Sequence, residues 1–177
     1  ITPIVDNIDF NKGLDFKTVD GLEAKQFAYH GYWAKDFTSL DPTLGDIDTF
    51  KELIKKAHDR GIKIMVDVVL NHAGYGMKDI EETWKQDALY LPTDVERARL
   101  EGMLRDVDED PVVRGELDHL PDLKTEDPAV RAKIIEWQTA WLEKARTDRG
   151  DTIDYFRVDT VKHVDPTTWM AFKNTLT

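Results

Sequence analysis

The chain has 177 residues, of which 41% are hydrophobic and 33% charged, enough for one ordinary domain with a sizeable core. Its 35 acidic and 24 basic residues give a formal net charge of −11, which argues against a nucleic-acid-binding protein because such proteins usually present a basic face. No apolar run approaches the roughly 20 residues of a membrane-spanning helix, and the absence of cysteine excludes disulfides and thiolate metal sites.

The first predicted unit is a helix followed by a strand. Hydrophobic residues recur at helical spacing from Asp48 to Arg60, so an amphipathic helix is predicted there, with Asp48 as its cap and Gly61 at its end. The run from Ile62 to Leu70 is almost continuously apolar, as in a parallel strand covered on both faces. A helix that leads into such a strand indicates an α/β fold.

A second unit of the same kind follows near the end of the chain. A hydrophobic stripe predicts a helix from Pro128 to Ala145, and its members are Val130, Ile134, Trp137 and Trp141. A turn at Gly150 precedes a strand from Ile153 to Asp159, and a last helix is expected over Thr167 to Leu176. Because the chain opens without an initiator Met and closes inside this helix, we expect a segment of a longer protein.

Residues 73–125 separate the two units and show no strand–helix rhythm. Ordinary loops between strands and helices run about 2–6 residues, so a connection this long is usually functional or a small inserted domain.

Charged residues alternate with apolar ones at the end of the second strand. Arg157 and Asp159 share one face of a strand, while Phe156 and Val158 share the other, which is expected to pack against helices. An arginine beside a carboxylate favours its ionised form, which a carboxylate nucleophile requires. Barrel enzymes place such groups at the carboxyl ends of strands. The pattern leaves two interpretations open, a catalytic carboxylate or a structural ion pair.

The first strand ends in a similar way. Asp67 and Asn71 fall on one face, and His72 follows directly. An aspartate inside an apolar run is costly unless it is paired or functional. One polar residue at a strand end is more often a satisfied hydrogen-bonding group than a ligand. Two parallel strands that both end in polar residues favour a shared site.

Four segments together resemble the α-amylase family. Residues 67–72 and 156–164 resemble its first and second signature regions, and Leu120 to Leu123 resembles the short signature near the end of its inserted domain B. Tyr29 to Trp33 resembles the aromatic stretch on the loop before the third barrel helix. All four occur in the family's order, with plausible spacings.

The resemblance implies an α/β fold, a partial (β/α)₈ TIM barrel of about strands 2–4 with a domain B-like insertion. The expected strands are Ile1–Val5 (the end of the second), Lys63–Asn71 (the third) and Ile153–Asp159 (the fourth). The expected divisions are residues 1–72 as a barrel segment, 73–125 as the insertion, and 126–177 as a barrel segment with helix 3, strand 4 and the start of helix 4.

The resemblance also implies a retaining glycoside hydrolase acting on α-1,4-glucans such as starch. Asp159 would be its nucleophile, and Arg157 would hold that carboxylate in its ionised form. Residues implied to bind the sugar or support its site are His30, Tyr32, Trp33, Asp67, His72, Tyr75, Lys162 and His163. Tyr and Trp side chains more often lie in the hydrophobic core than stack against a sugar, so a core position stays open as the alternative for Trp33.

A structural calcium ion is implied as well. Its expected ligands are the Asn71 side-chain oxygen, the Asp122 carboxylate and the backbone carbonyl of His163, because hard oxygen ligands suit calcium. The alternative is that Asp122 only caps a turn.

Two carboxyl groups that retaining catalysis uses in this family, a general acid Glu on the fifth strand and an Asp after the seventh, would lie beyond residue 177. We therefore expect this stretch alone to be inactive. Pullulanases, cyclodextrinases and transglycosylases share the motifs and remain alternatives, as do a non-catalytic carbohydrate-binding remnant and an unrelated metal-dependent barrel enzyme. Expected partners are an α-glucan and either the rest of the barrel or further copies joined through open strand edges. The parent enzyme is expected to be secreted, although this stretch does not itself determine that.

Overall fold

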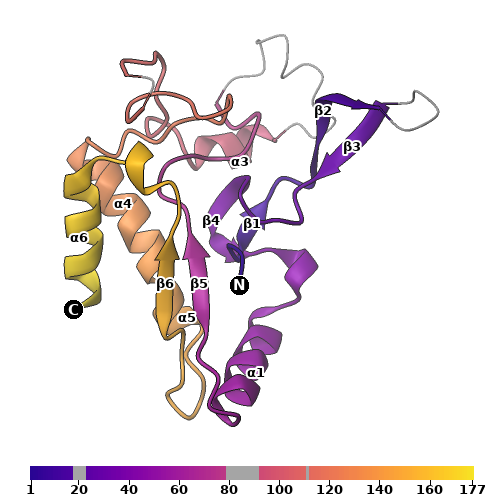
Figure 1. Cartoon of the computed structure of the whole chain (residues 1–177), viewed down its shortest axis with the longest axis vertical. Coiled ribbons are helices and arrows are strands. Elements are labelled where there is room, and N and C mark those ends of the chain that lie inside the picture. Colours follow the sequence, from indigo (N-terminus) through magenta and orange to yellow (C-terminus); the bar gives the residue numbers. More distant parts are fainter. Residues whose placement is uncertain (18–22, 79–91, 111) are drawn as a thin grey trace.

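The computed structural model describes residues 1–17, 23–78, 92–110 and 112–177 of the chain. In chain order its elements are β1 (Val5–Asn7), β2 (Phe10–Lys17), β3 (Glu23–Phe27), β4 (Ala34–Leu40), η1 (Pro42–Leu44), α1 (Ile47–His58), β5 (Met65–Val68), α3 (Asp94–Ala98), α4 (Pro128–Thr139), α5 (Trp141–Lys144), β6 (Tyr155–Val158), η2 (Val161–His163) and α6 (Pro166–Leu176). Within these residues the strands pair as β1–β4, β2–β3 and β5–β6, so the fold is mixed α/β with short sheets (Figure 1).

The predicted parallel strands are present and adjacent. β5 and β6 pair in parallel, with Met65 opposite Tyr155 and Val68 opposite Val158. Both are shorter than predicted, because regular pairing starts at Met65 and Tyr155. Asp159 extends the contact, since its backbone N–H donates to the carbonyl of Val68 at 3.0 Å. The carboxyl ends of the two strands therefore lie side by side.

The prediction for the first residues needs correction. The assigned strand is β1, which begins at Val5 and pairs antiparallel with β4. Ile1 makes the backbone hydrogen bonds to β5 that neighbouring strands of a parallel barrel would make. Its amino group donates to the Met65 carbonyl at 2.7 Å, and its carbonyl accepts from the Asp67 N–H at 3.0 Å. The sequence analysis predicted neither the β1–β4 pair nor the β2–β3 hairpin.

The N-cap of helix α1 lies two residues before the predicted one, and the helix begins at Ile47. The N-cap is Asp46, whose carboxylate accepts from the backbone N–H of Thr49 at 2.7 Å. Asp48 instead lies in the first turn, where a negative charge favours the helix dipole. Gly61 adopts φ +69° just beyond the helix, as expected for a helix end.

The helix predicted from Pro128 to Ala145 forms as α4 and α5, which meet at Ala140. Asp127 caps α4, and Pro128 occupies its first turn. The Thr139 hydroxyl donates to the Ile135 carbonyl at 2.8 Å, a side-chain bond that competes with helical pairing near the break. The predicted stripe is buried at Val130, Ile134 and Trp141 and partly buried at Trp137.

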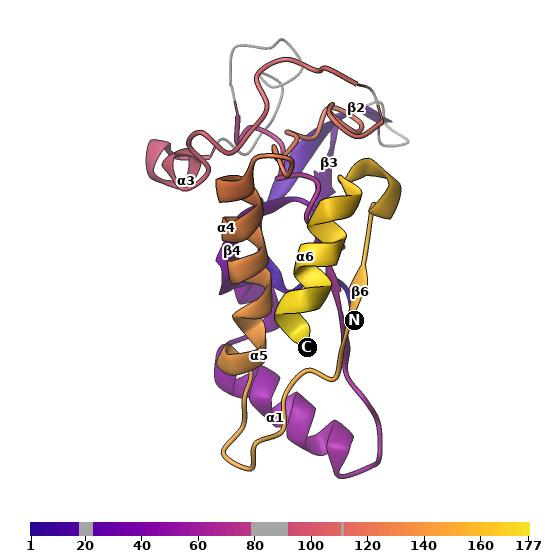
Figure 2. The same cartoon turned by 90° about the vertical axis from the view of Figure 1, so that its left-hand side faces the viewer.

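Helices α4 and α6 lie next to each other and cover one face of the β5–β6 pair (Figure 2). Phe156 and Val158 pack into this core, and the Phe156 and Phe172 rings lie 5.8 Å apart. Gln138 of α4 donates to the Val69 carbonyl at 3.1 Å, which joins the helix to the segment after β5. The two faces predicted for β6 are therefore confirmed, and Arg157 and Asp159 lie away from the helices.

An ionic cluster holds the opposite, amino end of the two strands. The two ring nitrogens of His58 lie 2.7 Å from Asp154 and 3.2 Å from Asp151, so the imidazole donates to both carboxylates only when it is protonated. Asp154 also accepts from the Ile64 N–H at 2.8 Å and pairs with Lys63 at 2.9 Å. The cluster fastens the end of α1 to the start of β6.

This cluster predicts a pH dependence of stability. Hydrogen bonding to Asp154 and then Asp151 raises the pKa of His58, so its contribution is complete below its unfolded value near 6.5 and is lost as pH rises through the higher folded value. The pKa of Asp154 falls to about 2 because its hydrogen bonds and charge partners outweigh burial, so its contribution is lost only in strong acid. The melting temperature should fall above about pH 6.5, and His58→Gln should flatten that slope. An unchanged slope in the variant would contradict this assignment.

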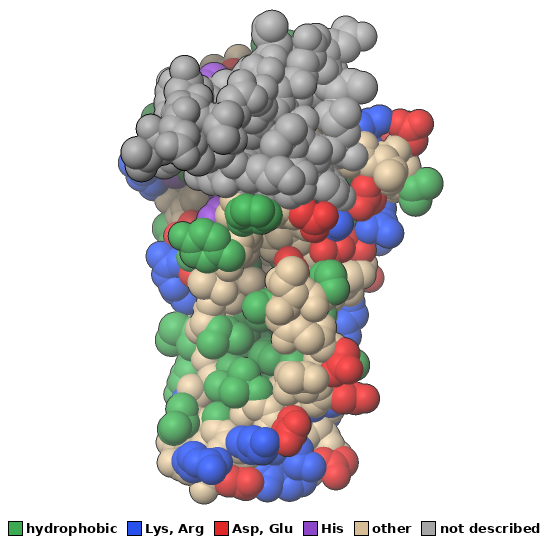
Figure 3. Space-filling view, turned by 90° about the vertical axis from the view of Figure 1, so that its right-hand side faces the viewer, with side chains coloured by type: hydrophobic (Ala, Val, Ile, Leu, Met, Phe, Trp, Pro, Cys, Tyr) green, Lys and Arg blue, Asp and Glu red, His purple; other side chains and the backbone are tan. Residues whose placement is uncertain are grey.

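Several large hydrophobic side chains lie exposed on or beside the central strands, with exposed fractions of 54% at Ile1, 47% at Met65 and 54% at Tyr155. Hydrophobic side chains also gather on the face seen in Figure 3. Within the described part of the chain, no helix is long and apolar enough to cross a membrane. Association through the open strand edges stays a prediction, and these exposed residues are consistent with it.

Candidate active site

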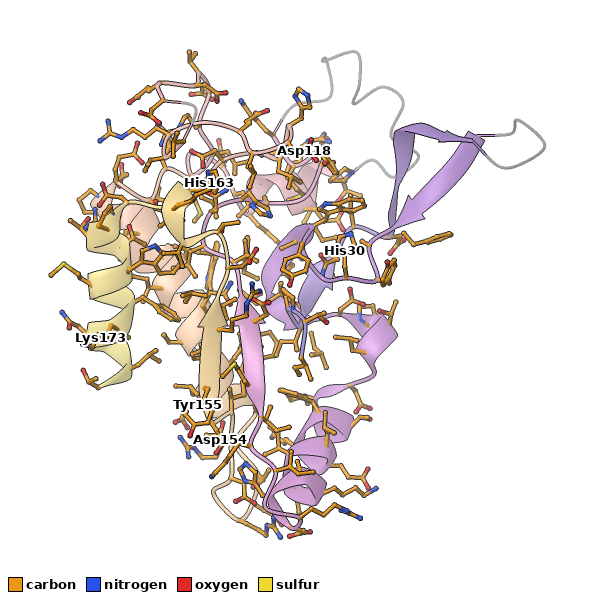
Figure 4. The ribbon with its side chains drawn as sticks, in the orientation of Figure 1. His30, Asp118, Asp154, Tyr155, His163 and Lys173 are labelled. Atoms are coloured by element: carbon orange, nitrogen blue, oxygen red, sulfur yellow. The ribbon has the colours of Figure 1, made fainter. Side chains whose placement is uncertain are left out.

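A connected set of polar groups lies where β5 and β6 end. Arg157 binds the Asp67 carboxylate through Nη1, and its Nη2 lies 3.0 Å from Oδ1 of Asp159. The Tyr32 hydroxyl donates to the same Asp67 oxygen at 2.8 Å. Figure 4 shows His30 and His163 at this end of the molecule, while Asp154 and Tyr155 mark the other end of β6.

The members of this set differ in exposure, which separates their roles. The Asp67 side chain is 6% exposed, whereas those of Asp159 and Arg157 are 26% and 53% exposed. Asp67 is thus the buried anchor of the guanidinium, and Asp159 is the carboxylate that another molecule can reach. An ion pair with one buried partner therefore exists, and Asp67 supplies the buried carboxylate.

His72 and Asn71 continue the polar end of β5. His72 Nε2 lies 3.1 Å from the Tyr32 carbonyl and must donate to it, so Nδ1 accepts from the Asn71 amide at 3.2 Å. Burial lowers the pKa of His72 to about 4, which keeps the ring neutral. Both ring nitrogens are engaged by protein groups, so a hydrogen bond to a sugar hydroxyl would require one of these bonds to be exchanged.

The aromatic residues next to Tyr32 form a small cluster. The Trp33 ring lies 4.5 Å from the His30 ring and 5.0 Å from the Tyr75 ring. Trp33 and Tyr75 are 6% and 9% exposed, and the Tyr75 hydroxyl donates to the Asp118 carbonyl at 3.1 Å. Trp33 and Tyr75 thus pack as a core beneath the site, with Tyr32 and His30 more exposed.

The aromatic stretch also depends on Gly31, which adopts φ +85° and lies close to Pro3. A Cβ at this position would stand 2.5 Å from the Pro3 carbonyl oxygen, too close for any side chain. We therefore expect Gly31→Ala to lower the free energy of unfolding by about 1–3 kcal/mol and to displace Tyr32 from Asp67. Urea unfolding would test the first effect. A variant as stable as the wild type would contradict this close approach.

The predicted calcium ligands come together in part. Asp122 forms an antiparallel bridge with His72, and the Leu123 N–H donates to the Asn71 carbonyl at 2.8 Å. The Oδ1 atom of Asn71 is buried and has no hydrogen-bond partner among the described residues, so it remains available to a cation. Burial outweighs the nearby Arg105 and raises the pKa of Asp122 to about 7. The oxygen donors of Asn71 and Asp122 fit a hard cation, whose charge would favour the ionised form of Asp122.

Other features are less favourable to a metal. The described ranges contain no group of three His, Cys, Asp or Glu residues that could hold a metal ion. The third predicted ligand is a backbone carbonyl, and the His163 imidazole is turned elsewhere, with Nδ1 2.7 Å from the Val112 carbonyl. Lys162 lies beside it in η2 with an exposed side chain.

Backbone strain and buried charge mark residues that sequence reasoning missed. Among the described residues, three non-glycine residues have positive φ, namely Asp118, His119 and Thr160, and the last follows Asp159 directly. Asp118 and His119 form a tight turn closed by the Leu120 N–H, which donates to the Leu117 carbonyl at 3.0 Å. Arg105 was missed too, because no periodicity or motif singles it out within residues 73–125.

Comparison with known proteins supports the resemblance across the chain. The family profile described as "Alpha amylase, catalytic domain" matches residues 1–174. The chain is 31% identical to the Beta/alpha-amylase of Paenibacillus polymyxa, over 91% of this chain and 13% of that protein. It is 30% identical to Neopullulanase 2 of Thermoactinomyces vulgaris, over 82% of this chain and 24% of that protein.

Solved structures give the same result for the fold. The α-amylase of Geobacillus thermoleovorans, solved as a complex with acarbose, matches with a TM-score of 0.66 and 28% identity, over 98% of this chain and 32% of that one. A cyclomaltodextrin glucanotransferase with three domains matches with a TM-score of 0.71 and 26% identity, over 99% of this chain and 35% of that one. The chain thus spans about a third or less of these four proteins. It belongs to the alpha-amylase family, whose catalytic domain it matches over almost its whole length.

Proposed function

We propose that this chain is part of a retaining glycoside hydrolase that cleaves α-1,4-glucans, with Asp159 as the nucleophile. The observation that supports the proposal best is the position of Asp159, which is accessible at the end of β6 and paired with Arg157 at 3.0 Å. The buried Asp67 also binds that guanidinium, and the Tyr32 hydroxyl donates to Asp67. β5 and β6 would be the third and fourth strands of a (β/α)₈ barrel completed by further chain.

In this proposal the chain supplies one half of the chemistry. An oxygen of Asp159 attacks the anomeric carbon, the bond from that carbon to the glycosidic oxygen breaks, and a glycosyl ester forms. A general acid outside these residues protonates the departing oxygen. The conjugate base of that acid then takes a proton from water, which attacks the same carbon and releases Asp159 as a carboxylate. Arg157 pairs with Asp159 and orients it, while His30, His72, Tyr32, Lys162 and His163 would surround the sugar.

The substrate class is proposed from the relatives. One solved relative was crystallised as a complex with acarbose, and others carry the names neopullulanase and cyclomaltodextrin glucanotransferase. Hydrolysis and transfer differ in whether water or a sugar hydroxyl attacks the glycosyl ester, so both fit the same Asp159. We propose hydrolysis as the main reaction.

Covalent trapping in the full-length polypeptide tests the nucleophile. A fluorinated α-glycosyl donor that forms the ester but hydrolyses slowly should label one peptide, and mass spectrometry should place the label on Asp159. A label on another carboxylate would reject the assignment. For the 177-residue chain alone, labelled maltooligosaccharide should be bound without product, which would also be the outcome for a non-catalytic binding remnant. Trapping in the full-length polypeptide separates these cases.

We also propose a structural calcium ion held by Asn71, Asp122 and the His163 carbonyl, supported by the buried and unpartnered Asn71 oxygen. When bound, the ion would join residues 120–123 to the end of β5. A ligand at a hundredfold excess over its Kd stabilises the folded state by about 2.7 kcal/mol. Removing calcium with a chelator should therefore lower the melting temperature. An unchanged melting temperature, with no metal found by elemental analysis, would remove this site.

A further inference from the structure

Arg105 is a buried charge that the proposed reaction does not use. Its side chain is 3% exposed, and its Nε donates to Oδ2 of Asp122 at 2.7 Å. Nη2 binds both carboxylate oxygens of Glu126, at 2.9 and 2.8 Å, and Nη1 lies 3.5 Å from Glu109. The Arg105 N–H also donates to the Asp122 carbonyl at 2.8 Å. The guanidinium therefore acts as a fixed cation among three carboxylates.

One of these carboxylates is shared with the proposed metal site. The Asp122 side chain is 1% exposed, so its negative charge must be compensated within the protein. Through its bridge with His72, Asp122 also joins its segment to the end of β5 next to Asn71. Arg105 compensates the charge at the same point where a calcium ion would do so.

We propose that Arg105 is a resident cation that competes with calcium for the Asp122 carboxylate and holds residues 120–123 on the end of β5 when no metal is bound. This inference rests on the calcium site of the proposed function.

Electrostatic repulsion predicts that Arg105 weakens the binding of calcium. Two cations that share one carboxylate repel each other, and the repulsion is poorly screened in a buried site. Each cation therefore weakens the binding of the other, and this coupling is reciprocal. Removing the guanidinium leaves the Asp122 charge buried and unpaired, which destabilises the metal-free protein. Calcium should then restore more stability than it adds to the wild type.

The experiment uses Arg105→Gln in the full-length polypeptide, because glutamine is neutral and retains an amide that can donate to Asp122. The melting temperature is measured with chelator and with saturating calcium, and the calcium Kd by titration calorimetry. We expect a lower melting temperature in chelator, a larger increase on adding calcium, and a Kd tighter by about 5–150-fold, the usual range for coupled sites. A variant that folds only with calcium would agree with this.

Two controls isolate the position and the charge. Arg105→Lys keeps a positive charge and should show a calcium-induced increase close to that of the wild type. Arg146→Gln removes an exposed arginine that pairs with Glu143 and should leave the increase unchanged.

Other results would overturn the proposal. If Arg105→Gln lowers the melting temperature equally with and without calcium, Arg105 is only a structural ion-pair partner. If calcium binding weakens or disappears, or if calcium does not restore folding, Arg105 does not compete with the metal. Failure of the calcium site itself is distinguishable, because wild-type protein would then show neither calcium binding nor a calcium-induced increase.

Discussion

Asp159→Asn in the full-length polypeptide is expected to lower kcat on maltooligosaccharides by roughly 10⁴-fold or more, in line with the loss of other catalytic nucleophiles. The amide is nearly the same size as the carboxylate, but it cannot form the glycosyl ester or stabilise positive charge at the anomeric carbon. Glucan binding should largely persist. Rates are to be compared at equal folded fraction, because the change also removes one partner of Arg157.

Asp67→Asn provides the matched control. Asp67 is buried and contacts Tyr32 and Arg157, so in the proposed mechanism it supports Arg157 and is not the group that attacks the sugar. Its loss should reduce turnover less than the loss of Asp159. Near-normal turnover in Asp159→Asn, or a greater loss in Asp67→Asn, would show that the nucleophile is misassigned.

Trp141→Ala should cause the largest loss of stability among the substitutions considered, about 3–5 kcal/mol. The side chain is 2% exposed, and its indole N–H donates to the Phe37 carbonyl at 3.1 Å. Truncation would open a cavity between α5 and β4 and leave that carbonyl without its partner. Urea unfolding monitored by circular dichroism gives the change in free energy.

Trp141→Phe separates the two contributions. It keeps most of the ring volume but loses the N–H donor, so it should cost clearly less than the alanine variant. An equal loss in both variants would mean that the hydrogen bond to Phe37, and not packing, dominates at this position.

The parts of the fold predicted from sequence are those with strong local patterns. The stripe on α4 and the alternation at Phe156 to Asp159 each determine a face, and both faces are as predicted. The apolar run is buried on both faces only from Val66 onward, because Ile62 and Met65 are exposed. The β1–β4 pair was missed because its strands are separated by more than 25 residues and their pairing shifts register twice. The helix cap was misplaced because Asp46 and Asp48 are both good caps, and only the bond to Thr49 selects the first.

For the site, sequence predicted which residues gather but not how they bond. The alternation placed Arg157 and Asp159 on one face, yet nothing local shows that Arg157 also binds Asp67, which is 90 residues away. Similarly, His72 was predicted as a ligand of sugar, whereas its ring bonds to Tyr32 and Asn71 in this structure. Such bonds depend on the packing of distant segments, which periodicity does not encode. The calcium ligands and the sugar contacts stay predictions.

Tyr32 contacts the end of β5 at two points, since its hydroxyl binds Asp67 and its carbonyl binds His72. Any movement of Tyr32 would therefore disturb Asp67, which binds Arg157, and the His72 imidazole at the same time. When segments are exchanged between related enzymes, residues 29–33 and residues 67–72 should have to come from the same parent. Chimeras that take both segments from the same parent should keep their activity, while those that take one from each parent should lose it even when every individual residue is compatible with the fold.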